Sequence, residues 1–129
     1  MLNKQVNELI GQSQMAAKRA YAPYSNFQVG AALLLADGSV SVGCNIENAS
    51  YGATVCAERV AVFSACASGK LSSEQPPLML AVTALPCALC LQVLAEFAAP
   101  DFPIWVCAGA GSESQHFLLK ELLPHTFKL

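Results

Sequence analysis

Two short motifs hold the residues best suited to chemistry: Val-Cys-Ala-Glu-Arg around Cys56 and Pro-Cys-Ala-Leu-Cys ending at Cys90. A Cys-x-x-Cys pair such as Cys87 and Cys90 directs two thiolates at one centre, and Cys56 can supply a third. Three protein ligands leave the fourth tetrahedral position to water, as in catalytic zinc sites. Glu58 is too close to Cys56 in sequence to chelate comfortably, but it can reach that water. We therefore predict a Zn²⁺ site at Cys56, Cys87 and Cys90, with Glu58 transferring protons.

Both motifs lie at the beginning of expected helices, over residues 55–67 and 87–98. The positive end of a helix dipole stabilises a thiolate and lowers its pKa, which suits metal binding by Cys56 and Cys87. A lone Cys-x-x-Cys pair is also found as a redox pair or as two buried small hydrophobic residues. The combination of Cys-x-Glu with Pro-Cys-x-x-Cys favours zinc. The remaining cysteines are expected to be small core residues, namely Cys44, Cys66 and Cys107.

The elements that must position these motifs alternate between helix and strand. Apolar periodicity and turn residues predict helices at 4–21, 55–67, 87–98 and 120–123, and strands at 27–36, 39–45, 78–84, 103–108 and, at an edge, 115–119. Asp37-Gly38 predicts a two-residue hairpin between the first two strands. This order predicts an α/β fold, a three-layer α/β/α sandwich in which helices cover both faces of a mixed sheet.

The amino-acid composition of the chain limits which molecules it can be expected to bind. The chain has 129 residues, which fits a single catalytic domain over 1–129. Only 12% of residues are charged, against about 25% in typical domains, which favours a homo-oligomer over an apolar monomer. The net charge is −2, with seven scattered lysines and arginines, so a nucleic acid polymer is not an expected partner. The lack of a signal peptide or membrane-spanning stretch predicts a cytoplasmic protein that binds a small molecule.

The motifs resemble those of the small homotetrameric, zinc-dependent cytidine deaminases of nucleoside salvage, with Cys56 where other zinc deaminases carry histidine. The similarity covers nearly the whole chain: RAYAPYSNFQVGAAL at 19–33, GCNIENASYG at 43–52, CAER at 56–59, QVLAEF at 92–97 and ELLPHTF at 121–127. It implies a cytidine deaminase-like fold, Zn²⁺ as the cofactor and a tetramer. It also implies hydrolytic deamination of cytidine and deoxycytidine to uridine and deoxyuridine in pyrimidine salvage.

The resemblance assigns substrate contacts to four positions. Phe27 is expected to pack against the pyrimidine ring, and the Ala57 backbone to contact the base. Asn45 and Glu47 are expected to bind the ribose hydroxyl, a pairing that rejects ligands lacking that group. Taken by themselves, Asn45 also fits a turn residue and Phe27 a core aromatic residue.

Three further roles follow from the resemblance. Tyr51 and Phe127 resemble residues that such enzymes contribute to a neighbouring subunit's pocket, and Arg59 is expected to donate to a thiolate sulfur. Glu58 is expected to accept the proton of the zinc-bound water, so that hydroxide attacks C4 of the pyrimidine, and then to protonate N3 and the leaving amine.

Two positions depart from the family pattern. Leu91 stands where relatives usually have an arginine, which predicts a less acidic zinc-bound water and a shifted pH optimum. The connection at 84–86 is shorter than usual, which predicts a wider mouth. Two further functions therefore stay open: hydrolysis of N4-substituted or ring-substituted cytidine nucleosides, and a catalytically decayed zinc-binding scaffold.

Overall fold

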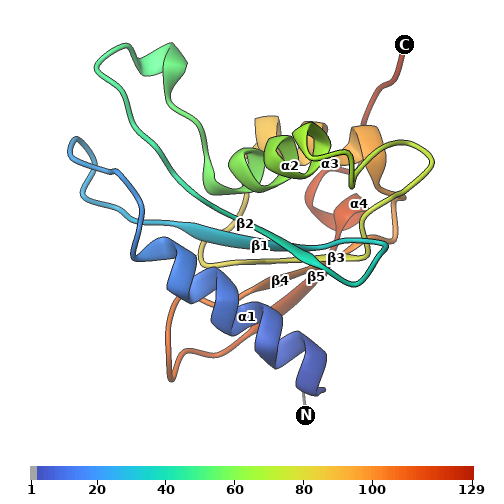
Figure 1. Cartoon of the computed structure of the whole chain (residues 1–129), viewed down its shortest axis with the longest axis horizontal. Coiled ribbons are helices and arrows are strands. Elements are labelled where there is room, and N and C mark those ends of the chain that lie inside the picture. The colour runs from blue at the N-terminus through green and yellow to red at the C-terminus, as the bar shows by residue number, and fades with distance from the viewer. Residues whose placement is uncertain (1–2) are drawn as a thin grey trace.

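The computed structural model describes residues 3–129 and contains one five-stranded sheet between two layers of helices (Figure 1). The elements in chain order are α1 (Lys4–Ala17), β1 (Gly30–Leu34), β2 (Val40–Cys44), the 3₁₀ helix η1 (Tyr51–Ala53), α2 (Ala57–Ala67), β3 (Met79–Val82), α3 (Ala88–Phe97), β4 (Pro103–Val106), β5 (Gln115–Leu118) and α4 (Leu119–Leu122).

The sheet is mixed, with the strand order β2-β1-β3-β4-β5. β1 pairs antiparallel with both β2 and β3, while β3 and β4 run parallel. Parallel neighbours need a crossover connection, and α3 provides it. β5 pairs antiparallel with β4 at the sheet edge. The predicted α/β/α sandwich with a mixed sheet and a late edge strand is confirmed.

Each face of the sheet has its own apolar core. α1 lies on one face, while α2, α3 and α4 lie on the other (Figure 1). The core beneath α1 includes Val6, Leu9 and Ile10 packed around Ala32 and Leu34 of β1. The larger core lies under α2 and α3, the two helices whose first residues follow Cys56 and Cys87. The site therefore lies at the ends of two helices held firmly by buried packing.

Two glycines let helices approach the sheet closely. A Cβ at Gly43 in β2 would collide with the Ala57 carbonyl oxygen and with the Ala61 nitrogen of α2, and one at Gly30 would collide with the backbone of α1. Any larger residue would displace the helix above it. Gly43 thus sets the height of the first turn of α2, which carries Glu58, above β2.

The first helix and first strand are shorter than predicted. α1 ends at Ala17 rather than at residue 21, because the Tyr21 backbone pairs with a distant segment: its N–H donates to Asn45 and its carbonyl accepts from the Glu47 N–H. β1 begins at Gly30 rather than at residue 27. Before it, Phe27 and Val29 bond to the Asn45 side chain, and Phe27 also bonds to the Ser25 hydroxyl, so residues 27–29 do not form a full strand ladder.

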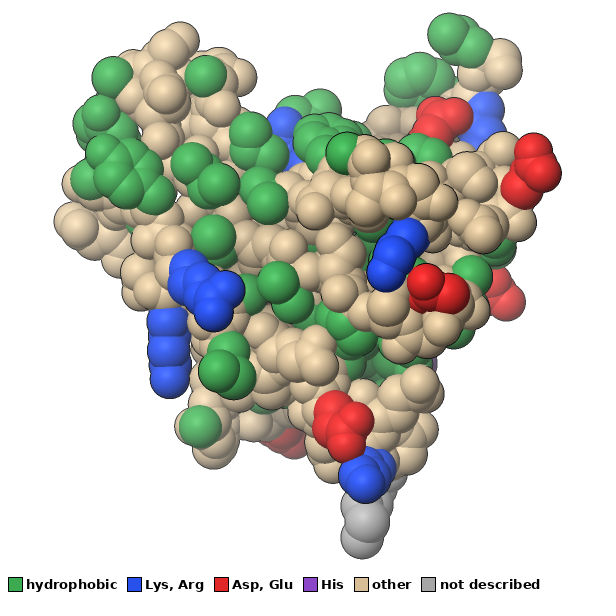
Figure 2. All heavy atoms as spheres, in the orientation of Figure 1, with side chains coloured by type: hydrophobic (Ala, Val, Ile, Leu, Met, Phe, Trp, Pro, Cys, Tyr) green, Lys and Arg blue, Asp and Glu red, His purple; other side chains and the backbone are tan. Residues whose placement is uncertain are grey.

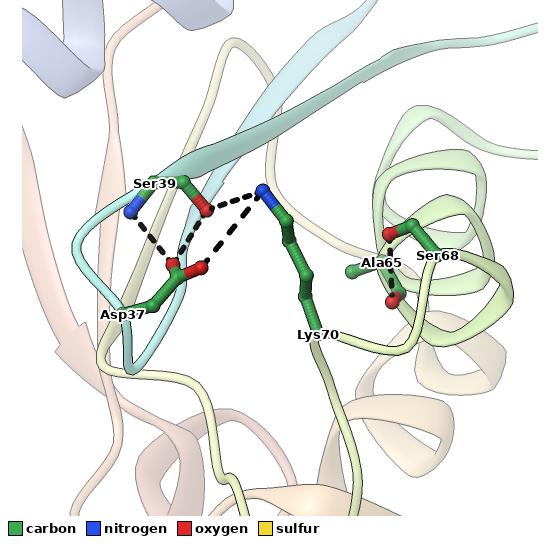
Figure 3. A network of polar contacts seen from close by, with 5 residues as sticks. All are labelled: Asp37, Ser39, Ala65, Ser68 and Lys70. Atoms are coloured by element: carbon green, nitrogen blue, oxygen red, sulfur yellow. Dashed lines mark hydrogen bonds and ion pairs between the residues drawn. The ribbon is translucent and has the colours of Figure 1, made fainter.

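The β1–β2 hairpin is confirmed, but its loop differs from the predicted two-residue turn. The Leu35 N–H donates to the Ser39 carbonyl at 2.9 Å, which leaves three loop residues, 36–38. Gly38 has φ +87°, the left-handed conformation that glycine adopts without strain in such three-residue loops. Figure 3 shows that Asp37 in this loop accepts from Ser39 and pairs with Lys70 after α2.

Candidate metal centre and its cavity

The first two cysteines occupy equivalent places on two helices. Cys56 is the N-cap of α2 and Cys87 the N-cap of α3, both with extended backbone, and neither side chain makes a capping hydrogen bond. Their sulfur atoms are therefore left for other partners at the positive ends of two helix dipoles. The helices begin one to two residues later than predicted, so these cysteines precede the first helical residue.

The third cysteine completes a cluster. Cys90 lies in the first turn of α3, and the Sγ atoms of Cys56, Cys87 and Cys90 lie within 4.8 Å of one another. The Cys87 and Cys90 sulfurs are 3.5 Å apart. Tetrahedral zinc with Zn–S bonds of 2.3 Å holds its sulfur ligands about 3.8 Å apart. The three thiols therefore fit a zinc ion, and they cluster as the sequence predicted.

The electrostatics of the cluster differ from thiol to thiol. Burial, reinforced by the negative charge of Glu58, raises the pKa of the Cys90 thiol far above its ordinary value. Burial also acts to raise the pKa of Cys87, but hydrogen bonds from the neighbouring residues outweigh it and the net pKa is lowered. A coordinated divalent cation deprotonates a thiol outright, so metal binding would bring all three sulfurs to the thiolate form.

Arg59 supports the cluster from the first turn of α2. Its Nη2 donates to Cys56 Sγ at 3.4 Å, which is the contact expected from the resemblance. Its Nε is buried and has no hydrogen-bond partner within residues 3–129. Arg59 therefore places positive charge against a sulfur-rich site that three thiolates would otherwise leave negative.

Glu58 is a buried acid next to the sulfur cluster. Its side chain is only 4% exposed, and it lines the cavity in front of the cysteines. Burial raises the pKa of its carboxyl group, while its own backbone N–H and Arg59 act in the opposite direction. A carboxyl group with a raised pKa can both accept and return a proton nearer to neutral pH.

A cavity of about 310 Å³ opens in front of the cluster. Its walls come from four chain segments, and they contain the following residues: Ser25, Phe27, Val29, Asn45, Glu47, Thr54, Cys56, Ala57, Glu58, Ala84, Leu85 and Cys87. Phe27, Asn45, Glu47 and Ala57, the four residues expected to contact substrate, all belong to this set. The structure thus gathers them around one space, although they come from separate segments.

Tyr51 and Phe127 lie outside this cavity. Tyr51 is 79% exposed and lines a neighbouring hollow of about 250 Å³ that shares Ser25, Glu47 and Thr54 with the cavity. Phe127 is 69% exposed beside α2 and α3, where its carbonyl accepts from Gln92. Neither residue lines the cavity in front of the cysteines.

Two polar residues of the cavity wall were not predicted from the sequence. Ser25 and Thr54 line the cavity from loops, and no spacing rule distinguishes them from ordinary turn residues. Thr54 Oγ1 accepts from the Asn48 N–H at 3.1 Å and so closes the turn before α2. The one available signal for Ser25 was its place two residues before Phe27.

The remaining metal-capable residues stay apart from the cluster. Cys44, Cys66 and Cys107 do not join a metal-binding group in the part of the chain that the structure describes. His116 stacks on Trp105, with 4.3 Å between ring centroids, across β4 and β5.

Leu91, which stands where relatives usually have an arginine, is buried in the larger core. Within residues 3–129 no helix has the length and apolar character needed to span a bilayer.

Comparison with known proteins places this geometry in context. Residues 3–106 match the family described as the cytidine and deoxycytidylate deaminase zinc-binding region. The chain is 44% identical over 125 residues to a cytidine deaminase of Halalkalibacterium halodurans, covering 92% of this chain and 91% of that protein. It is 43% identical over 128 residues to that of Sporosarcina psychrophila, covering 95% and 90%.

Solved structures agree with the sequence relatives. The crystal structure of a cytidine deaminase from Burkholderia pseudomallei superposes with a TM-score of 0.85 at 39% identity, covering 98% of this chain and 100% of that chain. A cytidine deaminase from Mycobacterium tuberculosis superposes with a TM-score of 0.81 at 37% identity, with 98% and 100% coverage. Fold and sequence therefore point to the same group of proteins.

Proposed function

The chain belongs to the cytidine and deoxycytidylate deaminase zinc-binding family, and from this premise we propose that it hydrolyses cytidine and deoxycytidine to uridine and deoxyuridine. In this reaction a C4–O bond forms from water, the C4–N bond breaks and ammonia leaves. The observation that carries the proposal is a cluster of three thiols, two of which, Cys56 and Cys87, line a nucleoside-sized cavity together with the buried acid Glu58.

The metal centre is assigned to the three thiolates of Cys56, Cys87 and Cys90, with Arg59 balancing their charge. Bound zinc supplies Lewis-acid chemistry, lowering the pKa of a coordinated water from ~15.7 to about 7. Glu58 takes the proton of the attacking water and then passes protons to N3 and to the departing amine. Because the carboxyl group is buried, it transfers these protons without competition from bulk solvent.

Substrate binding is assigned to groups whose hydrogen-bonding capacity is only partly used. The side-chain carbonyl of Asn45 accepts from the Val29 N–H, and one side-chain N–H donates to the Phe27 carbonyl. The second side-chain N–H is left for a sugar hydroxyl. Ala57 is the first residue of α2, so its backbone N–H has no intrahelical partner and is available to the base. The exposed ring of Phe27 offers a flat apolar surface to the pyrimidine.

The charges around the cavity favour a nucleoside over a nucleotide. Among residues 3–129, no lysine or arginine lines the cavity or the hollow beside it, whereas Glu47 lines both. A 5′-phosphate would meet a carboxylate and no cation, which is unfavourable. We therefore expect cytidine and deoxycytidine to react, and the corresponding monophosphates to react at least about tenfold more slowly.

The test is a substrate panel on the purified zinc-loaded protein. Loss of cytidine absorbance, with uridine and ammonia formed in equal amounts, is the expected result, and prior treatment with a chelator should abolish it. Zinc bound without turnover of any cytosine nucleoside would instead support a decayed scaffold. Preference for the monophosphates would refute the choice of nucleoside.

The cavity wall formed by Ala84 and Leu85 favours a second class of substrate, substituted cytidine nucleosides. Ala84 and Leu85 lie one residue after the end of β3 and lead through Pro86 to Cys87, and Leu85 remains 59% exposed while lining the cavity. An apolar wall beside a proposed metal ligand suits cytidine nucleosides with an apolar group at N4 or C5. In that case N4-methylcytidine or 5-methylcytidine should react at rates comparable with cytidine, and Leu85→Asp should slow them more than cytidine.

The proposal also covers the oligomeric state of the protein and its cellular compartment. We propose that residues 1–129 act as one catalytic domain within a homotetramer, in which Tyr51 and Phe127 reach a neighbouring copy's pocket. The support is their exposure and the presence of other exposed large apolar side chains, such as Phe63 of α2. Figure 2 shows hydrophobic side chains at the surface of this face of the molecule, many of them toward the top of the view. All six cysteines are unpaired, which suits pyrimidine salvage in a reducing cytoplasm. Sedimentation and cell fractionation test these two points.

A further inference from the structure

Ser25 occupies the wall shared by the cavity and the adjacent hollow, in the loop between α1 and β1. It lies two residues from Phe27 but 22 residues from Glu47, and it bonds to both. From the family resemblance, Phe27 is expected to contact the base and Glu47 the sugar. The loop therefore connects two substrate contacts that the chain supplies from distant segments.

The bonds to Glu47 use most of its carboxylate. Glu47 Oε1 accepts from the Tyr24 N–H at 2.9 Å and from the Ser25 N–H at 3.2 Å. Oε2 accepts from the Ser25 hydroxyl. A carboxylate has about four acceptor positions, so one remains, on Oε2, for a sugar hydroxyl. The three protein bonds restrict the direction in which that last position points.

The same hydroxyl also holds the segment that carries the aromatic ring. Ser25 Oγ accepts from the Phe27 N–H at 3.0 Å while donating to Glu47. Between them, Asn26 has φ +57°, a left-handed conformation that is uncommon outside glycine. This turn brings the Phe27 N–H back to the Ser25 side chain, and Asn45 fixes the Phe27 carbonyl from the other side.

The surroundings of Glu47 keep its carboxyl group ionised and therefore able to accept hydrogen bonds. The hydrogen bond from Ser25 is the largest cause that lowers the pKa of the Glu47 carboxyl group. Glu47 makes no ion pair with any lysine or arginine of the described chain. Neutral donors therefore hold the carboxylate ionised without a cation that a sugar would have to displace.

We propose that Ser25 is a positioning residue that couples the sugar-binding carboxylate of Glu47 to the Phe27 segment, and so sets the spacing at which a nucleoside is recognised. This inference rests on the proposed function. One hydroxyl bonded to both elements makes them move together. A cytosine nucleoside then gains from both contacts at once, whereas a ligand that lacks the sugar hydroxyls gains only the ring contact.

The test compares Ser25→Ala with the parent protein on cytidine and on 2′,3′-dideoxycytidine, which lacks the sugar hydroxyls. The substitution should lower kcat/KM for cytidine about tenfold or more, mainly through KM, because an oriented charge-assisted bond is lost. For dideoxycytidine the change should stay below about threefold, because the contact that Ser25 positions is already absent. Ser25→Thr retains the hydroxyl and should recover most of the cytidine activity.

Ser73→Ala is the matched control, since Ser73 is an exposed loop serine with no side-chain hydrogen bond in the described chain. Zinc content and Tm should match the parent in every variant. Equal losses on the two substrates, or no loss on cytidine, would overturn the role of Ser25 while leaving the deaminase proposal intact. A parent protein that leaves cytidine unchanged would instead refute the proposed function itself.

Discussion

Asp37 and Glu47 are carboxylates at opposite ends of the β1–β2 pair, and each accepts hydrogen bonds from a serine hydroxyl and a backbone N–H. At Asp37 the donors belong to Ser39, two residues away, and Lys70 adds an ion pair at 3.8 Å (Figure 3). At Glu47 the donors come from more than 20 residues away, and no cation takes part. Both carboxyl groups have a lowered pKa.

The difference shows what separates a stabilising contact from a binding site. Asp37 is satisfied by its own turn and by a lysine, so its bonds close a hairpin and bring the end of α2 to it. Glu47 is held by neutral donors on one side and faces a cavity on the other. Near it lie the buried acid Glu58 and the thiol cluster, which have no counterpart at the hairpin end. Substitutions at the cavity end should therefore lower activity, whereas substitutions at the hairpin end should change only stability, and by a small amount.

The largest effect is expected from Cys87→Ser at the cavity end. Serine cannot replace the thiolate as a zinc ligand, so the variant should lose most of its zinc and all measurable deamination. Metal analysis after gel filtration checks this expectation. Cys66→Ser is the control, because Cys66 is far from the cluster in α2 and should leave zinc unchanged. Retention of a full zinc equivalent by Cys87→Ser would contradict the ligand assignment.

Glu58→Gln should cause the second-largest loss of activity. Glutamine keeps the size of the side chain but cannot transfer protons, and general acid–base groups contribute about 10²–10⁴-fold to rate. We expect kcat to fall by that amount while zinc content and fold are retained. Single-turnover kinetics with cytidine provide the measurement. Near-normal turnover would remove Glu58 from the mechanism.

Glu47→Gln should give an intermediate effect that tests the comparison directly. The neutral side chain loses the charge and one acceptor oxygen with its two positions, so the backbone N–H groups, the Ser25 hydroxyl and the sugar compete for the two that remain. The expected loss in kcat/KM for cytidine is about 10- to 100-fold, mostly in KM. Asp37→Asn, measured in the same assay, should match the parent. Equal activity losses in the two variants would mean that both carboxylates act only through stability.

Asp37→Asn should have the smallest effect, seen in stability alone. The folded pKa of Asp37 is lowered by the Ser39 bonds and Lys70, so its contribution is present above the unfolded pKa and is lost as pH falls through the folded value. The variant should melt slightly below the parent at pH 7, and the two Tm values should converge once the pH falls below the lowered folded pKa of Asp37. A larger difference at low pH than at neutral pH would contradict this sign.

The sequence predicted the fold class and most elements because periodic apolar residues and turn residues act locally. Errors lay at element ends whose backbone pairs with distant segments, as at Tyr21, which bonds to Asn45 and Glu47 instead of extending α1. The hairpin was predicted from Asp37-Gly38, but its loop length depended on the pairing of Leu35 with Ser39. Local rules do not include such partners.

What the sequence determined by itself was the chemistry: which residues can bind zinc, which acid lies beside them, and that basic side chains are too few for a polymer. Residue type and short spacing suffice for these conclusions, because Cys87 and Cys90 share one helical turn and Glu58 follows Cys56 on another. Tertiary structure decided the rest. It brought two helix starts together, buried Glu58 and gave Ser25 its two partners, since these depend on packing between segments that are far apart in the chain.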